Sequence, residues 1–236
     1  MLFYFIRHGE PDYTTDTLTP LGVRQAEAVA RRLSVHGIDR IYSSPLGRAR
    51  QTAQPTAELQ RLSVEIEDWT SESLAWKDFS EKREDGRTHW VFDRPDTEVL
   101  NADSMRYTND NWYTLPAFAN INAKAGYERI QRASDDFFAR QGYVREGAKY
   151  RIERPNNDRV ALFAHAGFGF VFLSALLQIP PQFFFTLFDF THAGISIFHF
   201  ENNPDGYSMP RCLSFNDTAF LYEDRLPLRY NGGLKL

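Results

Sequence analysis

Three short segments of the chain place basic side chains near glycine, and together they could hold an anion. Arg7-His8-Gly9-Glu10 sets a guanidinium beside an imidazole, and its glycine permits a close approach of the backbone. Arg48 lies within the segment 43–53, and His165 is followed by Ala166 and Gly167. An anionic group held against an imidazole is the chemistry that these residue types suit.

Each segment also has an ordinary structural interpretation. The first could be a surface turn, because short motifs match by chance. Arg48 and Arg50 could be solvated helix charges, and a lone histidine such as His165 is more often structural. The chemical interpretation therefore depends on whether the fold brings the three segments together.

The alternation of predicted strands and helices indicates that the fold brings the three segments together. Residues 2–6, 38–43, 64–66 and 159–164 are short apolar runs typical of buried strands. Helices are predicted after them, from Thr19-Pro20 to Gly37, from Ser44-Pro45 with an interruption or kink at Pro55, and over residues 168–178. In such open α/β sheets, sites form beyond the carboxyl ends of the strands. Clustered cations at one edge are costly unless an anion neutralises them, which indicates a phosphate-like ligand.

The predicted fold is an α/β three-layer sandwich, with a mostly parallel central sheet and helices on both faces. A further helix is expected over residues 127–141, and further strands over 194–200 and 212–215. The segment 73–125 is polar, rich in aromatic residues and weakly periodic. We expect one domain over residues 1–236, with residues 73–125 as an insertion that packs over the active site.

Composition limits the function classes. The net charge of −4 and the pI near 5.9 argue against an electrostatic nucleic-acid binder. No apolar run is long enough for a signal-peptide core or a membrane span, since the richest is broken by Pro180 and Pro181. The single cysteine, Cys212, is interpreted as a buried thiol in a reducing compartment. We therefore expect a cytoplasmic protein with no nucleic-acid or membrane partner, and the oligomeric state is not predicted.

Four pieces of the sequence, in order, resemble the histidine phosphatase superfamily, which includes the cofactor-dependent phosphoglycerate mutases and many bacterial phosphatases. They are Arg7 to Glu10, Leu18 to Gly22 with Gln25-Ala26, Ser43 to Ala53, and His165 to Gly167. The resemblance covers both ends of the chain and leaves mainly the segment 73–125 unmatched. It implies a phosphatase that acts on a small phosphorylated substrate, with no metal and no cofactor.

The resemblance also implies roles for individual residues. His8 would attack phosphorus with a neutral ring nitrogen, while Arg7, Arg48 and His165 would hold the phosphoryl oxygens. Ala166 and Trp76 are further candidates for substrate binding, and Tyr107 and Trp112 are candidates for the pocket wall. The family also has an acidic proton donor shortly after its third strand, and Glu72 fits that place. Its pKa would have to be raised, as burial could achieve, and Asp68 and Asp78 are alternatives.

Two departures from the family pattern bear on function. The family often has glycine directly after the late histidine, where this chain has Ala166. The segment between Glu10 and Thr19 is shorter than in the mutases, whose longer loop contacts substrate. This favours a phosphatase over a phosphoglycerate-type mutase, for which Lys82, Arg83, Arg87 and Arg106 are candidate second-anion ligands without a pattern. A catalytically inactive phosphate-binding or interaction domain is the third alternative.

Overall fold

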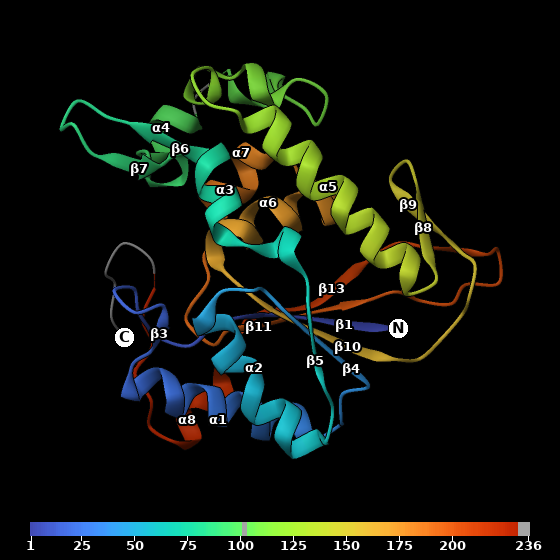
Figure 1. Cartoon of the computed structure of the whole chain (residues 1–236). Coiled ribbons are helices and arrows are strands. Elements are labelled where there is room, and N and C mark those ends of the chain that lie inside the picture. The colour runs from blue at the N-terminus through green and yellow to red at the C-terminus, as the bar shows by residue number, and fades with distance from the viewer. Residues whose placement is uncertain (101–102, 231–236) are drawn as a thin grey trace.

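The computed structural model describes residues 1–100 and 103–230. Its centre is a six-stranded sheet in the order β13-β11-β1-β10-β4-β5 (Figure 1). The strands are β1 (Leu2–Arg7), β4 (Arg40–Ser43), β5 (Val64–Ile66), β10 (Arg159–Ala164), β11 (Ile195–His199) and β13 (Arg211–Asp217). β1, β10, β4 and β5 run parallel, and β11 runs antiparallel to its neighbours β1 and β13. The predicted mostly parallel sheet is confirmed.

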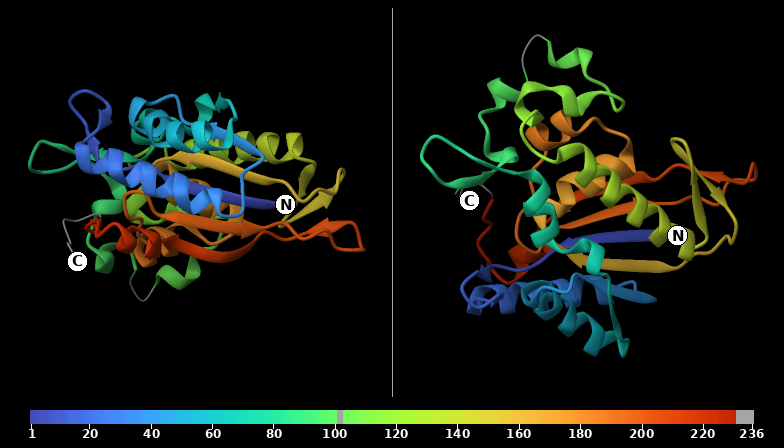
Figure 2. Two further views of the ribbon diagram at one scale, coloured as in Figure 1. Left: turned by 90° about the horizontal axis from the view of Figure 1, so that it is seen from below. Right: turned by 45° about the horizontal axis from the view of Figure 1, so that its top comes forward.

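Helices cover both faces of this sheet (Figures 1 and 2). One face carries α1 (Pro20–Ser34), α2 (Gly47–Gln60) and α8 (Ala219–Glu223). The other carries α3 (Glu72–Phe79), α5 (Ala123–Arg140), α6 (Ala166–Leu177) and α7 (Pro181–Leu187). Alternation along β1 explains the layers, because Phe3 and Phe5 belong to one buried cluster while Tyr4 and Ile6 belong to the other.

Phenylalanine dominates the core on the α5 and α6 side. The ring of Phe3 packs edge-on against Phe138 with a centroid separation of 5.2 Å and against Phe172 with 5.8 Å. Phe138 also stacks on Phe172 with ring centroids 6.4 Å apart. Burial of large rings in favourable mutual geometry is a strong source of core stability, and it accounts for much of the aromatic composition.

Most of the segment 73–125 lies outside the helices on the α3, α5 and α6 side of the sheet, at the top of Figure 1. It contains most of α3, a short hairpin of β6 (Ser80–Lys82) and β7 (Thr88–Trp90), and α4 (Asp96–Val99). Single turns of 3-10 helix cover the remainder at Val91–Asp93, Ser104–Arg106, Trp112–Thr114 and Pro116–Phe118, and another precedes α3 at Asp68–Thr70. Smaller ribbons elsewhere are β2 (Pro11–Asp12) with β3 (Thr17–Leu18), and β8 (Tyr143–Glu146) with β9 (Lys149–Ile152) and β12 (Tyr207–Ser208).

Three local predictions are wrong. The residue that caps α2 is Leu46 rather than Ser44, whose hydroxyl instead lies 2.7 Å from His165 Nε2. Pro55 does not interrupt α2, because Ala53 and Ala57 on either side of it are buried against α1 and outweigh one lost hydrogen bond. Cys212 is exposed rather than buried, because it lies on the edge strand β13.

None of the helices in the described part of the chain is both long and apolar enough to cross a bilayer.

Candidate active site

The three predicted segments meet at the carboxyl ends of three adjacent parallel strands. Arg7 is the last residue of β1, and the His8 amide donates to the Ala164 carbonyl of β10 at 2.9 Å. Ser44 follows β4, and its amide donates to the Phe163 carbonyl at 2.9 Å. His165 directly follows β10. Backbone pairing within the sheet therefore fixes the relative positions of all three segments.

Two glycines bring the turn after β1 against the start of α1. A Cβ on Gly9 would lie 2.6 Å from the Gly22 carbonyl oxygen, and a Cβ on Gly22 would lie 2.1 Å from the Glu10 carbonyl oxygen. No side chain fits between these backbones. Gln25 completes the contact, because its side-chain oxygen accepts from the Glu10 amide at 2.7 Å. The early motifs thus position His8 by close packing.

His8 is held as a neutral imidazole whose Nε2 lone pair accepts from Arg48. Its Nδ1 lies 2.7 Å from the Gly9 carbonyl oxygen, which can only accept, so Nδ1 carries the proton. Arg48 Nε donates to the opposite ring nitrogen, Nε2, at 3.2 Å. Burial, followed by the charges of His165, Arg7 and Arg48, lowers the pKa of His8 well below its ordinary value. Nε2 therefore keeps a lone pair that could attack an electrophile.

Glu72 lies between the cations and the start of α6. One carboxylate oxygen pairs with Arg48 Nη2 at 2.7 Å and lies 3.7 Å from His165 Nδ1. The other accepts from the Gly167 amide at 3.0 Å, at the amino end of α6. Burial opposes the charge of Glu72 most strongly, but His165, Arg48 and Arg7 together outweigh it, so its pKa is lowered. The expected raised pKa is therefore not found in this state, because the cations that surround the carboxylate stabilise its ionised form.

Three buried nitrogen atoms of the site have no hydrogen-bond partner within the described residues. They are Arg7 Nε and His165 Nδ1, on residues that are 4% and 0% exposed, and His192 Nδ1. The rest of Arg7 is held firmly, since Nη1 donates to the Phe190 carbonyl at 2.6 Å and Nη2 donates to His192 Nε2 at 3.0 Å. Unsatisfied buried donors are rare in native proteins and suit a site that receives oxygen atoms from a ligand.

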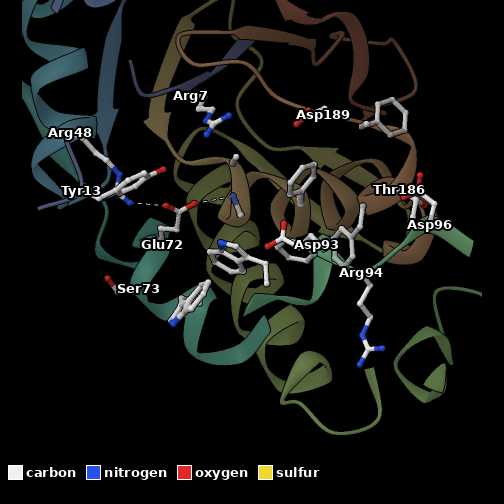
Figure 3. A pocket seen from close by; sticks show the side chains of 18 residues that line it. Arg7, Tyr13, Arg48, Glu72, Ser73, Asp93, Arg94, Asp96, Thr186 and Asp189 are labelled. Atoms are coloured by element: carbon white, nitrogen blue, oxygen red, sulfur yellow. Dashed lines mark hydrogen bonds and ion pairs between the residues drawn. The ribbon is translucent and has the colours of Figure 1, made fainter. Parts of the chain in front are cut away.

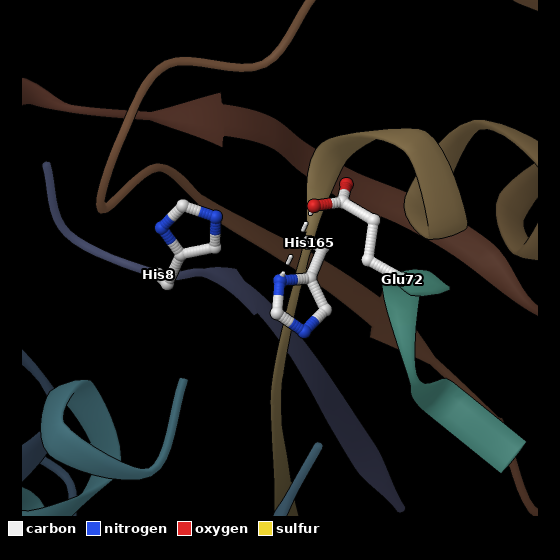
Figure 4. Close-up of side chains that lie close together, drawn as sticks. All are labelled: His8, Glu72 and His165. Carbon is white, nitrogen blue, oxygen red and sulfur yellow. Dashed lines mark ion pairs between the residues drawn. The ribbon is translucent and has the colours of Figure 1, made fainter. Parts of the chain in front are cut away.

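His8, Glu72 and His165 lie close enough to share a metal ion (Figure 4). Their candidate ligand atoms all lie within 4.8 Å of one another. Two imidazoles and a carboxylate are an acceptable set for a transition metal. Arg7 and Arg48 beside them would oppose a second positive charge, so the surrounding electrostatics fit an anion better than a cation.

A cavity of about 1070 Å³ opens from this cluster (Figure 3). Arg7, Arg48 and Glu72 line one end, together with Ala166 and Gly167. Trp76 lines its wall as predicted, whereas Tyr107 and Trp112 lie outside the described lining. Trp112 is 2% exposed and packs on Phe118 with ring centroids 5.2 Å apart, so it is local core, and Tyr107 packs against the same core.

The structure also distinguishes Glu72 from the carboxylates near it in the sequence as the candidate acid. Asp78 pairs with Arg129 Nη2 of α5 at 2.8 Å, and Asp68 is exposed. Glu67, at the end of β5, accepts from Trp69 Nε1 at 2.6 Å and pairs with Arg140. Of these four carboxylates, only Glu72 lines the cavity.

The amino-terminal part of the chain matches a known protein family. The sequence model of the histidine phosphatase superfamily (branch 1) matches residues 3–111, which include Arg7, His8, Arg48 and Glu72. The resemblance to the histidine phosphatase superfamily is confirmed.

Individual relatives match over limited stretches of the chain. A probable phosphoglycerate mutase of Proteus mirabilis is 41% identical over 70 residues, 26% of this chain and 33% of that protein. A probable phosphoglycerate mutase of Klebsiella pneumoniae is 30% identical over 130 residues, 48% of this chain and 60% of that protein. The matches thus span between a third and three-fifths of the length of these two curated relatives.

Solved structures match over nearly the whole chain. A phosphoserine phosphatase from Entamoeba histolytica aligns with a TM-score of 0.60 and 20% identity, covering 93% of this chain and 98% of that one. A mycobacterial glucosyl-3-phosphoglycerate phosphatase aligns with a TM-score of 0.57 and 18% identity, covering 92% and 99%. At these identities the likeness shows a shared histidine phosphatase fold.

Three further side chains at this site lie outside the sequence motifs. Asp16 pairs with Arg48 Nη1 and accepts from the Gly47 amide at 2.6 Å, and Tyr13 lies with its ring centroid 5.3 Å from the Arg48 guanidinium carbon. His192 accepts from Arg7 and lies with its ring centroid 5.6 Å from that of His8. Asp16 and Tyr13 carry no motif signal, while the position of His192 before a strand was the only hint.

Proposed function

We propose that the chain is a metal-independent phosphatase that hydrolyses a small phosphomonoester through a phosphohistidine on His8. In this proposal residues 1–236 act as one domain, with the segment 73–125 as an insertion. The observation that carries the proposal is the state of His8. A neutral imidazole with Nδ1 donating to the Gly9 carbonyl leaves Nε2 as a nucleophile amid three phosphate-binding side chains.

In the first step, His8 Nε2 attacks phosphorus and the bond from phosphorus to the ester oxygen breaks. The incoming phosphoryl group must displace the Arg48 Nε–H from the Nε2 lone pair, so Arg48 turns that donor to a phosphoryl oxygen. Arg7 Nε and His165 Nδ1, which have no partner in the described structure, offer further donors to the oxygens. Fixed donors of this kind stabilise the charge spread over the phosphoryl group in the transition state.

Glu72 donates the proton that the leaving oxygen needs. It is paired with Arg48 before substrate binds, and its pKa is then low. A phosphate dianion brings negative charge beside it and engages Arg48, and both changes raise the pKa of Glu72. The substrate thereby converts a resting carboxylate into an acid, which solvent protonates before the alcohol leaves.

In the second step, water attacks the phosphohistidine. Glu72, now a carboxylate, accepts a proton from the water, while the bond from phosphorus to Nε2 breaks and returns its electron pair to His8. Inorganic phosphate leaves, His8 is again neutral with its proton on Nδ1, and Glu72 releases its proton to solvent as it pairs with Arg48 again. Each turnover therefore consumes one ester and one water.

The test is phosphate release from phenyl phosphate in excess EDTA. We expect wild-type activity to survive the chelator and to fall at least about 10³-fold in His8→Ala. His36→Ala is the matched control, because His36 is exposed on the far side of α1 from the site and should keep full activity. An acid-labile phosphoenzyme should appear in rapid-quench samples of wild type alone.

Two results would contradict the proposal. Activity abolished by EDTA and restored by a divalent ion would favour the metal set of His8, Glu72 and His165. Activity retained in His8→Ala would remove His8 as the nucleophile. The absence of both turnover and phosphoenzyme in wild type would favour a binding domain.

A phosphoglycerate-type mutase is the second candidate, because the relatives matched over 70 and 130 residues are probable mutases. Phosphoryl transfer between a bisphosphate and a monophosphate, without net phosphate release, would support it. Lys82, Arg83, Arg87 and Arg106 lie outside the described lining of the cavity, which speaks against a second anion site built from them.

A further inference from the structure

The cavity is much larger than a phosphoryl group. The residues along its remaining walls indicate the chemistry of the group that is esterified to the phosphate. Its volume of about 1070 Å³ is at the upper end of the usual range for small-molecule sites. Arg7, Arg48 and Glu72 line one end, whereas Asp96 and Thr186 line the opposite end and Asp93 lies between them (Figure 3). Whatever is esterified to the phosphate must fit between these ends.

The middle of the cavity is a continuous aromatic wall. Trp76 meets Trp90 edge-on with ring centroids 4.7 Å apart, and Trp90 stacks on Phe92 at 5.3 Å. Phe92 in turn contacts Phe185 at 4.3 Å. The Trp90 ring and Glu72 both lie against Gly167, since a Cβ on this glycine would lie 2.7 Å from the ring and 3.1 Å from Glu72 Oε1. The aromatic wall therefore begins beside the proposed acid. An apolar or aromatic body attached to the phosphate would therefore lie on this wall.

Carboxylates line the cavity beyond the phosphoryl end. They belong to Asp93 and Asp96, whereas Asp189, which also lines the cavity, interacts with the charge of Arg7. Within the described chain, no basic side chain lies at ion-pair distance from Asp93 or Asp96. Asp189 accepts from the Phe190 amide at 2.7 Å. Asp93 is an exposed residue, and partial burial of its carboxylate raises its pKa against the opposing charge of Arg83.

The cations that line the cavity do not neutralise the carboxylates at this end. Arg7 and Arg48 lie at the phosphoryl end, and the third, Arg94, is engaged elsewhere. Its guanidinium pairs with Glu81 and, at 3.0 Å, with Glu98, and it points away from the other labelled side chains in Figure 3. A second anionic group on the substrate would thus meet carboxylates without a free cation in the described lining.

We propose that the cavity selects phosphomonoesters whose organic part is an apolar or aromatic body bearing a cationic group, such as an ammonium. The carboxylates attract the cation and the aromatic faces bind it from the side, a combination that recognises ammonium groups well. Esters with a second anion, such as a carboxylate or another phosphate, are excluded by the same charges. This inference rests on the proposed function and specifies its substrate class.

The experiment uses three aryl phosphates that differ only in the para substituent: aminomethyl, hydrogen and carboxymethyl. We expect kcat/KM to fall in that order, with at least about a tenfold difference between the cationic and anionic esters, equal to about 1.4 kcal/mol. Asp93→Asn and Asp96→Asn should each reduce this ratio. Asp110→Asn removes an exposed carboxylate from the same segment, outside the described lining, and should leave the ratio unchanged.

The corresponding benzylphosphonates separate selection from chemistry, because they cannot be hydrolysed. Their affinities for the wild-type protein, measured by titration calorimetry, should follow the same order. Turnover that depends on His8 but favours the anionic ester would overturn the charge selection and leave the phosphatase proposal intact. Absence of turnover, with the cationic phosphonate still bound tightest, would overturn the phosphatase proposal and keep the selection.

Discussion

The two ends of the cavity are built in different ways. The phosphoryl end consists of side chains at the ends of adjacent buried strands, fixed by sheet pairing and by the contact of Gly9 with Gly22. The far end consists of short turns and a seven-residue helix, whose carboxylates at Asp93 and Asp96 are exposed. In the proposed mechanism, the reaction and its substrate selectivity therefore depend on separate parts of the chain, and either one could change without the other.

Removal of the proposed acid alone should have the largest effect, and it should affect only the phosphoryl end. Glu72→Gln should lower kcat on phenyl phosphate by about 10²- to 10⁴-fold, because the leaving oxygen then departs without a proton. The loss should be smaller on 4-nitrophenyl phosphate, whose leaving group needs less protonation. Steady-state kinetics with both esters measures the contrast.

Glu65→Gln, on the exposed edge strand β5, is the control for this change and should behave as wild type. An equal loss on both esters would mean that Glu72 orients Arg48 rather than donating a proton. The ranking of the three benzylphosphonates should be preserved in Glu72→Gln, since the far end is intact.

Acid should destabilise the phosphoryl end selectively. Burial lowers the pKa of His165 to about 4, against 6.5 for the unfolded chain. Between these values the unfolded chain binds a proton that the folded chain does not, so stability is complete above pH 6.5 and falls as the pH drops toward 4. The expected loss from His165 alone is about 3 kcal/mol.

Urea unfolding in EDTA at pH 7, 5.5 and 4.5 measures this loss. His165→Asn should flatten the dependence on pH, whereas His36→Asn, at an exposed position, should not. An unchanged slope in His165→Asn would show that other groups control acid stability.

The smallest expected effect lies where the two ends meet. Gly167→Ala would place a methyl group 2.7 Å from the Trp90 ring and 3.1 Å from Glu72 Oε1. We expect a loss of about 1–3 kcal/mol in unfolding free energy, together with a lower kcat/KM, because the wall and the acid must both shift. Trp90→Phe in the same chain should restore part of the stability by removing the contacted ring atoms. Restoration of neither property would place the strain at Glu72 instead.

The sequence predicted the phosphoryl end better than the far end for a physical reason. Arg7, His8 and His165 each follow a short apolar strand within two residues, so a local pattern locates them on the sheet edge. The polar partners Asp16 and His192 reach the site only through tertiary packing, and nothing local distinguishes them. The direction of the Glu72 pKa likewise depends on cations from three other segments, so burial alone gave the wrong expectation.

The same distinction applies to the fold. Strands β1 and β10 and the capped start of α1 at Thr19-Pro20 were predictable from apolar runs and turn chemistry. Continuation of α2 through Pro55 was not, because packing against α1 decided it. In the segment 73–125, tertiary contacts determine which aromatic residues line the cavity and which are core, as Trp76 and Trp112 show.

The tryptophans of the aromatic wall also give the protein an intrinsic fluorescence signal for binding. Two of the four tryptophans, Trp76 and Trp90, lie in contact within the cavity wall, while Trp69 and Trp112 pack into the core. A cation that settles on the wall would quench or shift the emission of the first pair and leave the second pair as an internal reference. Occupancy of the selective end can therefore be followed by intrinsic fluorescence, independently of turnover and without a label.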